Sequence, residues 1–213
     1  MWQVFLSFSD TRLSESMTHE YLTKMPVSVR TAILRFRRWE DRQAALFGKL
    51  LLQRALDCRN SDQGSSALDR LEYTEAGKPF IRGAASFNIS HSGGCVALAL
   101  ADSGKVGIDV EKIRPIQVEE FFRYLPEISE FKLCDADLRL NMFYSCWTKK
   151  EAVLKGEGTG LQAPLEQVQL QHDTAIFHKQ VWHLQRIDCG ADYICHVASS
   201  VRHAGCRIEV VNF

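Results

Sequence analysis

The chain has 213 residues, of which 46% are hydrophobic and 24% charged, as expected for a globular protein with a substantial core. Its 26 basic and 26 acidic side chains give a formal net charge of +0, so the overall charge gives no argument for binding nucleic acid or an anionic membrane. No run approaches the roughly 18 apolar residues of a membrane-spanning helix, and the N-terminal sequence MWQVFLSFSD lacks the regions of a secretory signal. The seven cysteines include no C-x-x-C pair, which favours reduced thiols and a cytoplasmic location.

The first half of the chain predicts one long helix among short strands. Apolar residues recur at helical spacing through Ala44, Phe47, Leu51 and Ala55, and they predict a helix over residues 40–56. Alternating or continuous apolar runs predict strands, and polar segments that contain glycine predict the turns between them. The expected elements are strands at 2–8, 71–74, 86–89 and 95–101, a short helix at 18–25, a polar loop at 60–66 and a tight turn at 102–105.

Basic residues are concentrated on the long helix and just before it. Between residues 30 and 54 only Glu40 and Asp41 are acidic. The basic residues of the same segment are Arg30, Arg35, Arg37, Arg38, Arg42, Lys49 and Arg54. Such a cluster could hold a phosphate group or nucleic acid, or it could be the solvated face of a helix.

The segment FNISHSGG at residues 87–94 ends an apolar run in polar residues and two glycines. Ser90, His91 and Ser92 supply hydroxyls and an imidazole beside a backbone that can approach a ligand closely. The alternative is an ordinary turn whose histidine has a hydrogen-bond partner within the protein.

The segment VGIDVE at residues 106–111 alternates as a strand does, so Asp109 and Glu111 are expected on the same face. Two neighbouring carboxylates repel each other, and a shared cation removes the repulsion. Oxygen ligands suit Mg²⁺, which commonly completes its coordination with water and substrate phosphate. The alternative is an edge strand with a solvated acidic face.

The turn at 102–105 divides the chain into two predicted halves, residues 1–104 and 105–213. The second half is expected to contain a helix at 118–124, an irregular acidic stretch at 126–137, a long helix at 137–155, and strands at 168–171, 174–178, 181–187, 193–199 and 207–211.

The long helix carries the sequence FYSCWTKKEAVLKGEGTGL at residues 143–161 and ends in a glycine-rich break. Glu151 and Lys155 are four residues apart, so both project from one face, with Trp147 one turn earlier on the same stripe. An exposed ion pair on an amphipathic helix would give the same spacing.

The three segments, in this order, resemble the 4′-phosphopantetheinyl transferases of the Sfp type. The family's hallmarks are an (I/V)SH segment, a GIDxE segment and a W(S/T/A)xKEAxxK segment. The chain has NISH at 88–91, GIDVE at 107–111 and WTKKEAVLK at 147–155, and GKPF at 77–80 stands where the family has its GKP. The resemblance runs from about the first strand to the last quarter of the chain.

The resemblance implies an α+β fold of two similar α/β halves related by a pseudo-twofold, each a long helix packed on a small, mainly antiparallel sheet. It implies transfer of the 4′-phosphopantetheine arm of coenzyme A to a serine of an apo acyl or peptidyl carrier protein. Adenosine 3′,5′-bisphosphate is the by-product, and the reaction depends on Mg²⁺. The family's single-chain form implies a monomer. A nucleic-acid or membrane partner is not expected, given the net charge of +0 and the lack of a long apolar run.

The same resemblance assigns residues to roles. The metal ligands would be Asp109, Glu111 and Glu151, and the catalytic residues Glu151 as candidate base, Lys155 at the pyrophosphate and His91 at a phosphate. The coenzyme A contacts would be Lys78, Pro79, Asn88, Ser90, His91 and Lys155, with Arg30, Arg35 and Arg42 as looser candidates for the 3′-phosphate. Alignment on Gly48 places Val29 and Ala32 where the family has basic residues. Lys150 is expected on the surface, and Phe121 and Phe122 in the core.

Two other functions remain open from the residues alone. A Mg²⁺-dependent hydrolase of coenzyme A or a related pyrophosphate would use the same carboxylates, with water in place of serine. A non-catalytic protein that binds coenzyme A or a carrier is the second alternative, although Glu151 and Lys155 are both present.

Overall fold

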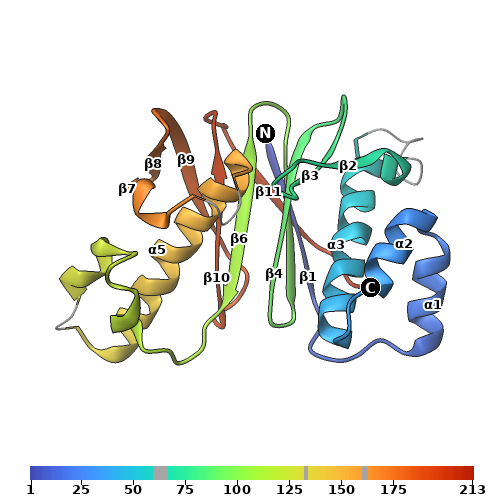
Figure 1. Cartoon of the computed structure of the whole chain (residues 1–213), viewed down its shortest axis with the longest axis horizontal. Coiled ribbons are helices and arrows are strands. Elements are labelled where there is room, and N and C mark those ends of the chain that lie inside the picture. The colour runs from blue at the N-terminus through green and yellow to red at the C-terminus, as the bar shows by residue number, and fades with distance from the viewer. Residues whose placement is uncertain (60–66, 132–133, 160–162) are drawn as a thin grey trace.

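The computed structural model describes residues 1–59, 67–131, 134–159 and 163–213, and Figure 1 shows two sheets with long helices on either side of them. The strand order is β11-β1-β5-β4 in the first sheet and β6-β10-β9-β8-β7 in the second, while β2 and β3 form a separate pair. All pairings are antiparallel except β1 with β11, which is parallel. The strands are β1 Trp2–Phe8, β2 Leu71–Tyr73, β3 Pro79–Ile81, β4 Ser86–Ser92, β5 Cys95–Ala101, β6 Val106–Lys112, β7 Gln169–Gln171, β8 Thr174–Phe177, β9 Gln180–Ile187, β10 Tyr193–Ser199 and β11 Cys206–Val210.

The α-helices are α1 Glu15–Thr23, α2 Val27–Leu34, α3 Trp39–Asp57 and α5 Ala136–Glu157. Short 3-10 helices span Leu68–Arg70, Val118–Phe121, Pro126–Phe131 and Leu165–Gln167. Asp135 caps α5 by accepting a hydrogen bond from the backbone N–H of Leu138, and Gly158 ends the helix at a φ of 88°. These end signals fix where the helix that carries Glu151 and Lys155 begins and stops.

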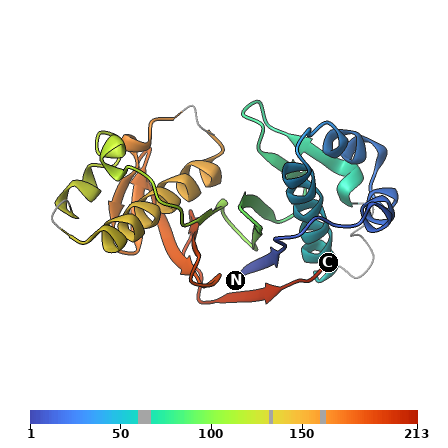
Figure 2. The same ribbon diagram turned by 90° about the horizontal axis from the view of Figure 1, so that it is seen from below.

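The core has one part under α3, two parts under α5 and a fourth part between the sheets. On one side α3 packs on the first sheet, and on the other α5 packs on the second. Alternate residues of β1, β5, β6 and β10 form the shared core, which includes Val4, Ala97, Ile108 and Val197. Figure 2 shows the strands in the middle and the helices on the two sides. The apolar side chains of β1 and β5 therefore pack directly against those of β6 and β10, and this contact joins the two halves.

The α+β fold class is confirmed, with a long helix on a mainly antiparallel sheet in each half. The expected strands and the two long helices are present, with ends that differ from the expected ones by at most three residues. The division at residue 104 stays a prediction, and the last strand, β11, pairs with β1 of the first sheet. The predicted loop at 60–66 lies outside the described residues.

Two helical segments differ from the expectation. The segment at 118–124 contains a 3-10 helix, Val118–Phe121, instead of an α-helix, and the stretch after it contains another, Pro126–Phe131. The helix α2 was not expected, because it has only eight residues and exposes Val27 and Leu34, which blurs its apolar pattern. None of the helices within the described residues has the length and apolar character needed to cross a membrane.

Candidate active site

Two carboxylates of β6 lie where the edges of the two sheets meet. The apolar residues Val106, Ile108 and Val110 of this strand face the shared core. The alternation of a strand therefore turns Asp109 and Glu111 to the opposite face, toward α5. Asp109 is 2% exposed, while Glu111 is half-buried.

The helix α5 adds a third carboxylate and a cation to this face. Glu151 is buried, and Lys155 lies one turn later on the helix. The Lys155 ammonium is 2.5 Å from Asp109 Oδ1 and donates a hydrogen bond of 2.8 Å to Ser90 Oγ. Lys155, four residues after Glu151, therefore contacts side chains of β4 and β6 instead of forming an exposed ion pair along the helix.

Two glycines allow α5 to approach β6 this closely. A Cβ on Gly107 would collide with the Ala152 carbonyl oxygen and with the backbone of Gly156, and a Cβ on Gly156 would collide with the Trp182 ring. Because neither residue has a side chain, the helix backbone can lie directly on the strand. The glycine of the GIDVE segment is therefore explained by helix packing.

Burial raises the pKa of all three carboxyls, and the carboxyls also act on one another. The pKa of Asp109 is raised by burial, against the opposing effect of Lys155. The pKa of Glu111 is raised by burial, against a hydrogen bond from Ser92 that lowers it, and is raised further by the charge of Asp109. Burial and then the charge of Asp109 raise the pKa of Glu151. The site favours a bound cation, because a positive charge would stabilise all three ionised groups.

The carboxylates also fit a divalent cation by their unused oxygens. Asp109 Oδ2 and Glu151 Oε1 are buried and have no hydrogen-bond partner. A buried carboxylate oxygen without a partner is costly unless a ligand fills the place. Within the described residues, however, no three His, Cys, Asp or Glu side chains are grouped closely enough to enclose an ion. In this structure the cation bound to Asp109 is Lys155.

The residues of the NISH segment have different environments. Asn88 Oδ1 accepts a hydrogen bond of 2.9 Å from the backbone N–H of Ile108, and both groups are buried. Ser90 Oγ donates to Asp109 Oδ1 at 3.0 Å and accepts from Lys155. His91 instead lines the two cavities described next. The pKa of its imidazole is lowered by partial desolvation and by Lys155, which favours the neutral form at neutral pH.

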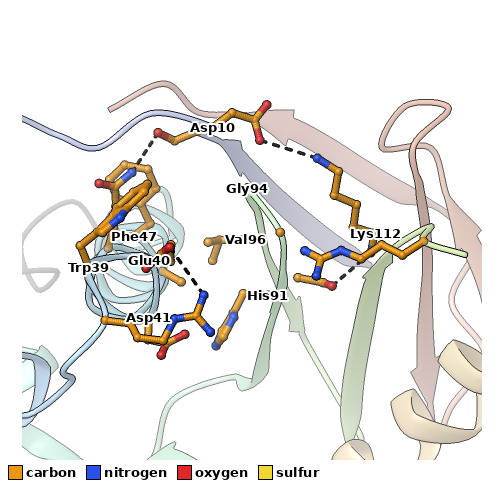
Figure 3. A pocket seen from close by; sticks show the side chains of 16 residues that line it. Asp10, Trp39, Glu40, Asp41, Phe47, His91, Gly94, Val96 and Lys112 are labelled. Carbon is orange, nitrogen blue, oxygen red and sulfur yellow. Dashed lines mark hydrogen bonds and ion pairs between the residues drawn. The ribbon is translucent and has the colours of Figure 1, made fainter. Parts of the chain in front are cut away.

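Two cavities lie on either side of His91. The first, of about 440 Å³, is shown in Figure 3, with Trp39, Asp41 and Phe47 of α3 on one side and Lys112 of β6 on the other. The second, of about 560 Å³, lies between α2, α3 and the β3–β4 region and is lined mainly by apolar residues. His91 and Ala44 line both cavities.

The predicted arginines do not converge. Arg35 lines the second cavity, together with His91 and Pro79. Arg30 is not among its lining residues, and Arg42 donates a hydrogen bond of 2.8 Å to the Phe36 carbonyl oxygen. Of the three candidates, the structure brings only Arg35 to this cavity.

Lys49 is a site residue that the sequence analysis left within the general basic cluster. Its side chain lines the second cavity, and its ammonium lies 6.0 Å from the centre of the Tyr73 ring. Burial lowers the pKa of the ammonium. The sequence signal was the position of Lys49 four residues after Ala45, which places both on the cavity side of α3.

Lys78 connects the GKPF turn to the second half of the chain. Its ammonium donates to the carbonyl oxygens of Gly156 at 2.6 Å and Val106 at 3.3 Å. Burial lowers its pKa to about 8, and the neighbouring charge of Lys105 acts in the same direction. Lys78 thus lies beside both α5 and β6.

The expectation of a surface position for Lys150 was wrong. The residue is 0% exposed, and its ammonium forms an ion pair of 2.8 Å with Glu127 Oε1. Phe121 and Phe122, expected in the core, are partly buried and pack against the hydrophobic cluster under α5. Trp147 belongs to the same cluster, with its ring 5.9 Å from that of Phe121.

Comparison with known proteins identifies the family. Residues 105–202 match the model of the 4′-phosphopantetheinyl transferase superfamily, and residues 14–103 match that of the 4′-phosphopantetheinyl transferase N-terminal region. The 4′-phosphopantetheinyl transferase Sfp of Bacillus subtilis is 34% identical over 77% of this chain and 74% of its own length. The chain belongs to the 4′-phosphopantetheinyl transferase family.

Other members are similarly related to this transferase. The 4′-phosphopantetheinyl transferase AcpT of Salmonella typhimurium is 34% identical over 74% of the chain and 75% of its own length. The L-aminoadipate-semialdehyde dehydrogenase-phosphopantetheinyl transferase of Xenopus laevis is 33% identical over 62% of the chain and 48% of its own length. The family membership makes the chain an enzyme that transfers a 4′-phosphopantetheine group, and it gives no support to the hydrolase or non-catalytic alternatives.

Proposed function

We propose that this transferase takes the 4′-phosphopantetheine arm from coenzyme A and attaches it to a serine of an apo acyl or peptidyl carrier protein. The observation that carries the proposal is the convergence of Asp109, Glu151 and Lys155 where the two sheets meet: the Lys155 ammonium contacts Asp109, and the charges of both act on Glu151. Carboxylates for a cation and ammonium groups for phosphate are what attack on a pyrophosphate requires. Both halves of the site come from one chain, which supports action as a monomer.

The carboxylates would hold Mg²⁺ through Asp109, Glu111 and Glu151, and when bound the ion would neutralise pyrophosphate charge. Glu151 can accept the proton of the carrier serine, because its Oε1 has no hydrogen-bond partner and its pKa is raised toward that of an effective base. Lys155 can donate to a phosphate oxygen and can protonate the leaving phosphate. It must then exchange its contact with Asp109 for the substrate.

The cavities beside His91 would receive the rest of coenzyme A. The apolar second cavity suits a base ring, with Arg35 and Lys49 available to an anionic group. His91 can donate one hydrogen bond to a phosphate from its neutral ring. The seven free cysteines agree with a reaction in the cytoplasm.

Incubation with coenzyme A, Mg²⁺ and an apo-carrier, followed by mass spectrometry, tests the proposal. We expect the carrier to gain one phosphopantetheine in step with release of adenosine 3′,5′-bisphosphate. A carrier whose modifiable serine is changed to alanine should give neither product. The same rate of adenosine bisphosphate release without any carrier would contradict the transfer and indicate hydrolysis.

A further inference from the structure

The edges of the two sheets are joined by side chains instead of a backbone ladder. β4 is the last strand of the first sheet and β6 the first strand of the second. Alternate side chains of β4 accept hydrogen bonds from alternate backbone N–H groups of β6. In each pair the β4 side chain accepts and the β6 backbone N–H donates: Ser86 from Val106 at 3.3 Å, Asn88 from Ile108 at 2.9 Å, Ser90 from Val110 at 3.3 Å, and Ser92 from Lys112 at 3.1 Å. The pairs run in the same direction along both strands, so β4 and β6 are parallel.

We call this row of four hydrogen bonds, from Ser86, Asn88, Ser90 and Ser92 of β4 to β6, the seam. The seam explains the spacing of polar residues in β4. The outer edge of β6 would otherwise leave its N–H groups without partners in the middle of the protein. Four short polar side chains at every second position satisfy them. The SxNxSxS pattern of residues 86–92 is therefore required by the contact between the sheets as well as by any ligand.

Two of the four seam residues also hold a carboxylate. Ser90 Oγ donates to Asp109 Oδ1, and Ser92 Oγ donates to Glu111 Oε2 at 2.6 Å. A hydroxyl has one proton to donate and lone pairs to accept with. The Ser92 hydroxyl donates its proton to the Glu111 carboxylate and accepts a hydrogen bond from the Lys112 N–H. The hydroxyl cannot rotate away without losing one of the two bonds.

We infer that Ser92 is a positioning residue for metal binding, because it fixes the Glu111 carboxylate through Oε2 and leaves Oε1 to face a ligand. The inference rests on the proposed function, since it takes Glu111 as a metal ligand. Ser92 lines the first cavity beside Arg114, whose charge also acts on Glu111. Without the serine hydroxyl, the half-buried Glu111 carboxylate would lose this hydrogen bond and would still be attracted by that cation.

Ser86 offers a matched control at the other end of the seam. Its hydroxyl accepts from the Val106 N–H as Ser92 accepts from Lys112, and it has no role in the proposed chemistry. Ser86→Ala therefore removes a seam bond while the carboxylates keep their partners. Ser92→Thr keeps the hydroxyl and tests whether the hydrogen bond, and not the size of serine, is what matters.

The experiment measures Mn²⁺ binding by electron paramagnetic resonance, with one equivalent of coenzyme A and no carrier. Ser92→Ala should weaken Mn²⁺ binding by about tenfold or more, as expected for a residue that orients a metal ligand. Ser92→Thr and Ser86→Ala should bind Mn²⁺ as the unaltered protein does. In the transfer assay Ser92→Ala should need about tenfold more Mg²⁺ for half-maximal rate, with a rate at saturating Mg²⁺ close to that of the unaltered protein.

Two results would overturn the inference alone. One is Mn²⁺ affinity of Ser92→Ala within twofold of the unaltered protein, and the other is an equal loss in Ser86→Ala. A different result would overturn the metal assignment as well: no Mn²⁺ binding by the unaltered protein, together with transfer that continues in chelator.

Discussion

The two long helices bury different kinds of side chain. The buried residues of α3 are apolar apart from Gln43 and Gly48, and they pack on the first sheet. The buried residues of α5 include Thr148, Lys150 and Glu151. A helix like α3 contributes chiefly hydrophobic stabilisation, whereas α5 carries polar groups into the protein, where each requires a partner.

The partners of α5 separate structural groups from functional ones. Lys150 pairs with Glu127, and Thr148 lies 2.8 Å from His196 Nδ1. The Thr148 hydroxyl donates to the Tyr144 carbonyl oxygen, so it accepts from His196, whose neutral ring must carry its proton on Nδ1. Glu151 Oε1, by contrast, has no partner. Lys150 Nζ also makes no hydrogen bond, but the charge of Glu127 compensates its own. The comparison teaches that Glu151 Oε1, which has no such compensation, is available to a ligand.

The largest effect is expected from removing the carboxylate that Lys155 contacts. Asp109→Ala should lower the transfer rate by roughly a thousandfold or more, because it removes a proposed metal ligand and the partner of Lys155. Circular dichroism should show an unchanged fold. Excess chelator should have a similar effect on the unaltered protein. Full activity of Asp109→Ala in chelator would exclude the metal role.

The structural ion pair of α5 should respond differently. Glu127→Gln would leave the fully buried Lys150 ammonium without its countercharge, and we expect a loss of about 3 kcal/mol in the free energy of unfolding. Adding Lys150→Met should restore much of it, because no unpaired charge then remains. Urea denaturation of the single and double variants measures both changes. Equal stability of all three proteins would show that the pair is energetically neutral.

His91 tests the first half of the site. His91→Ala should weaken coenzyme A binding by about ten- to a hundredfold, corresponding to the loss of a hydrogen bond to a charged group. Calorimetry without a carrier measures this affinity. The metal requirement of the remaining activity should stay the same. If the affinity does not change, the histidine is structural.

The smallest effect is a pH dependence of stability from His196. Burial lowers its pKa to about 3, so below the unfolded pKa of about 6.5 the unfolded chain binds a proton that the folded protein excludes. The free energy of unfolding should therefore fall by about 2 kcal/mol between pH 7 and pH 5 through this residue. His196→Gln should remove that part of the pH dependence in urea titrations. Identical pH profiles would show that His196 takes up its proton as readily in the folded protein as in the unfolded chain.

Local patterns were sufficient to predict several elements because their cause is local. Apolar spacing predicted α3, the sequence also predicted the long helix that became α5, and alternation predicted β6 with Asp109 and Glu111 on one face. The motif resemblance identified the family, which the comparisons confirm. The roles of the individual site residues remain predictions, although the structure brings Asp109, Ser90 and Lys155 into direct contact.

The sequence by itself determined the elements and the family, because helical and strand periodicity and short motifs depend on neighbouring residues. Only the tertiary structure decided which distant groups meet. It buried Lys150 against Glu127, brought Lys49 to a cavity and paired Ser92 with Glu111. These contacts depend on how two sheet edges and two helices pack, and no local pattern encodes the partner of a buried charge.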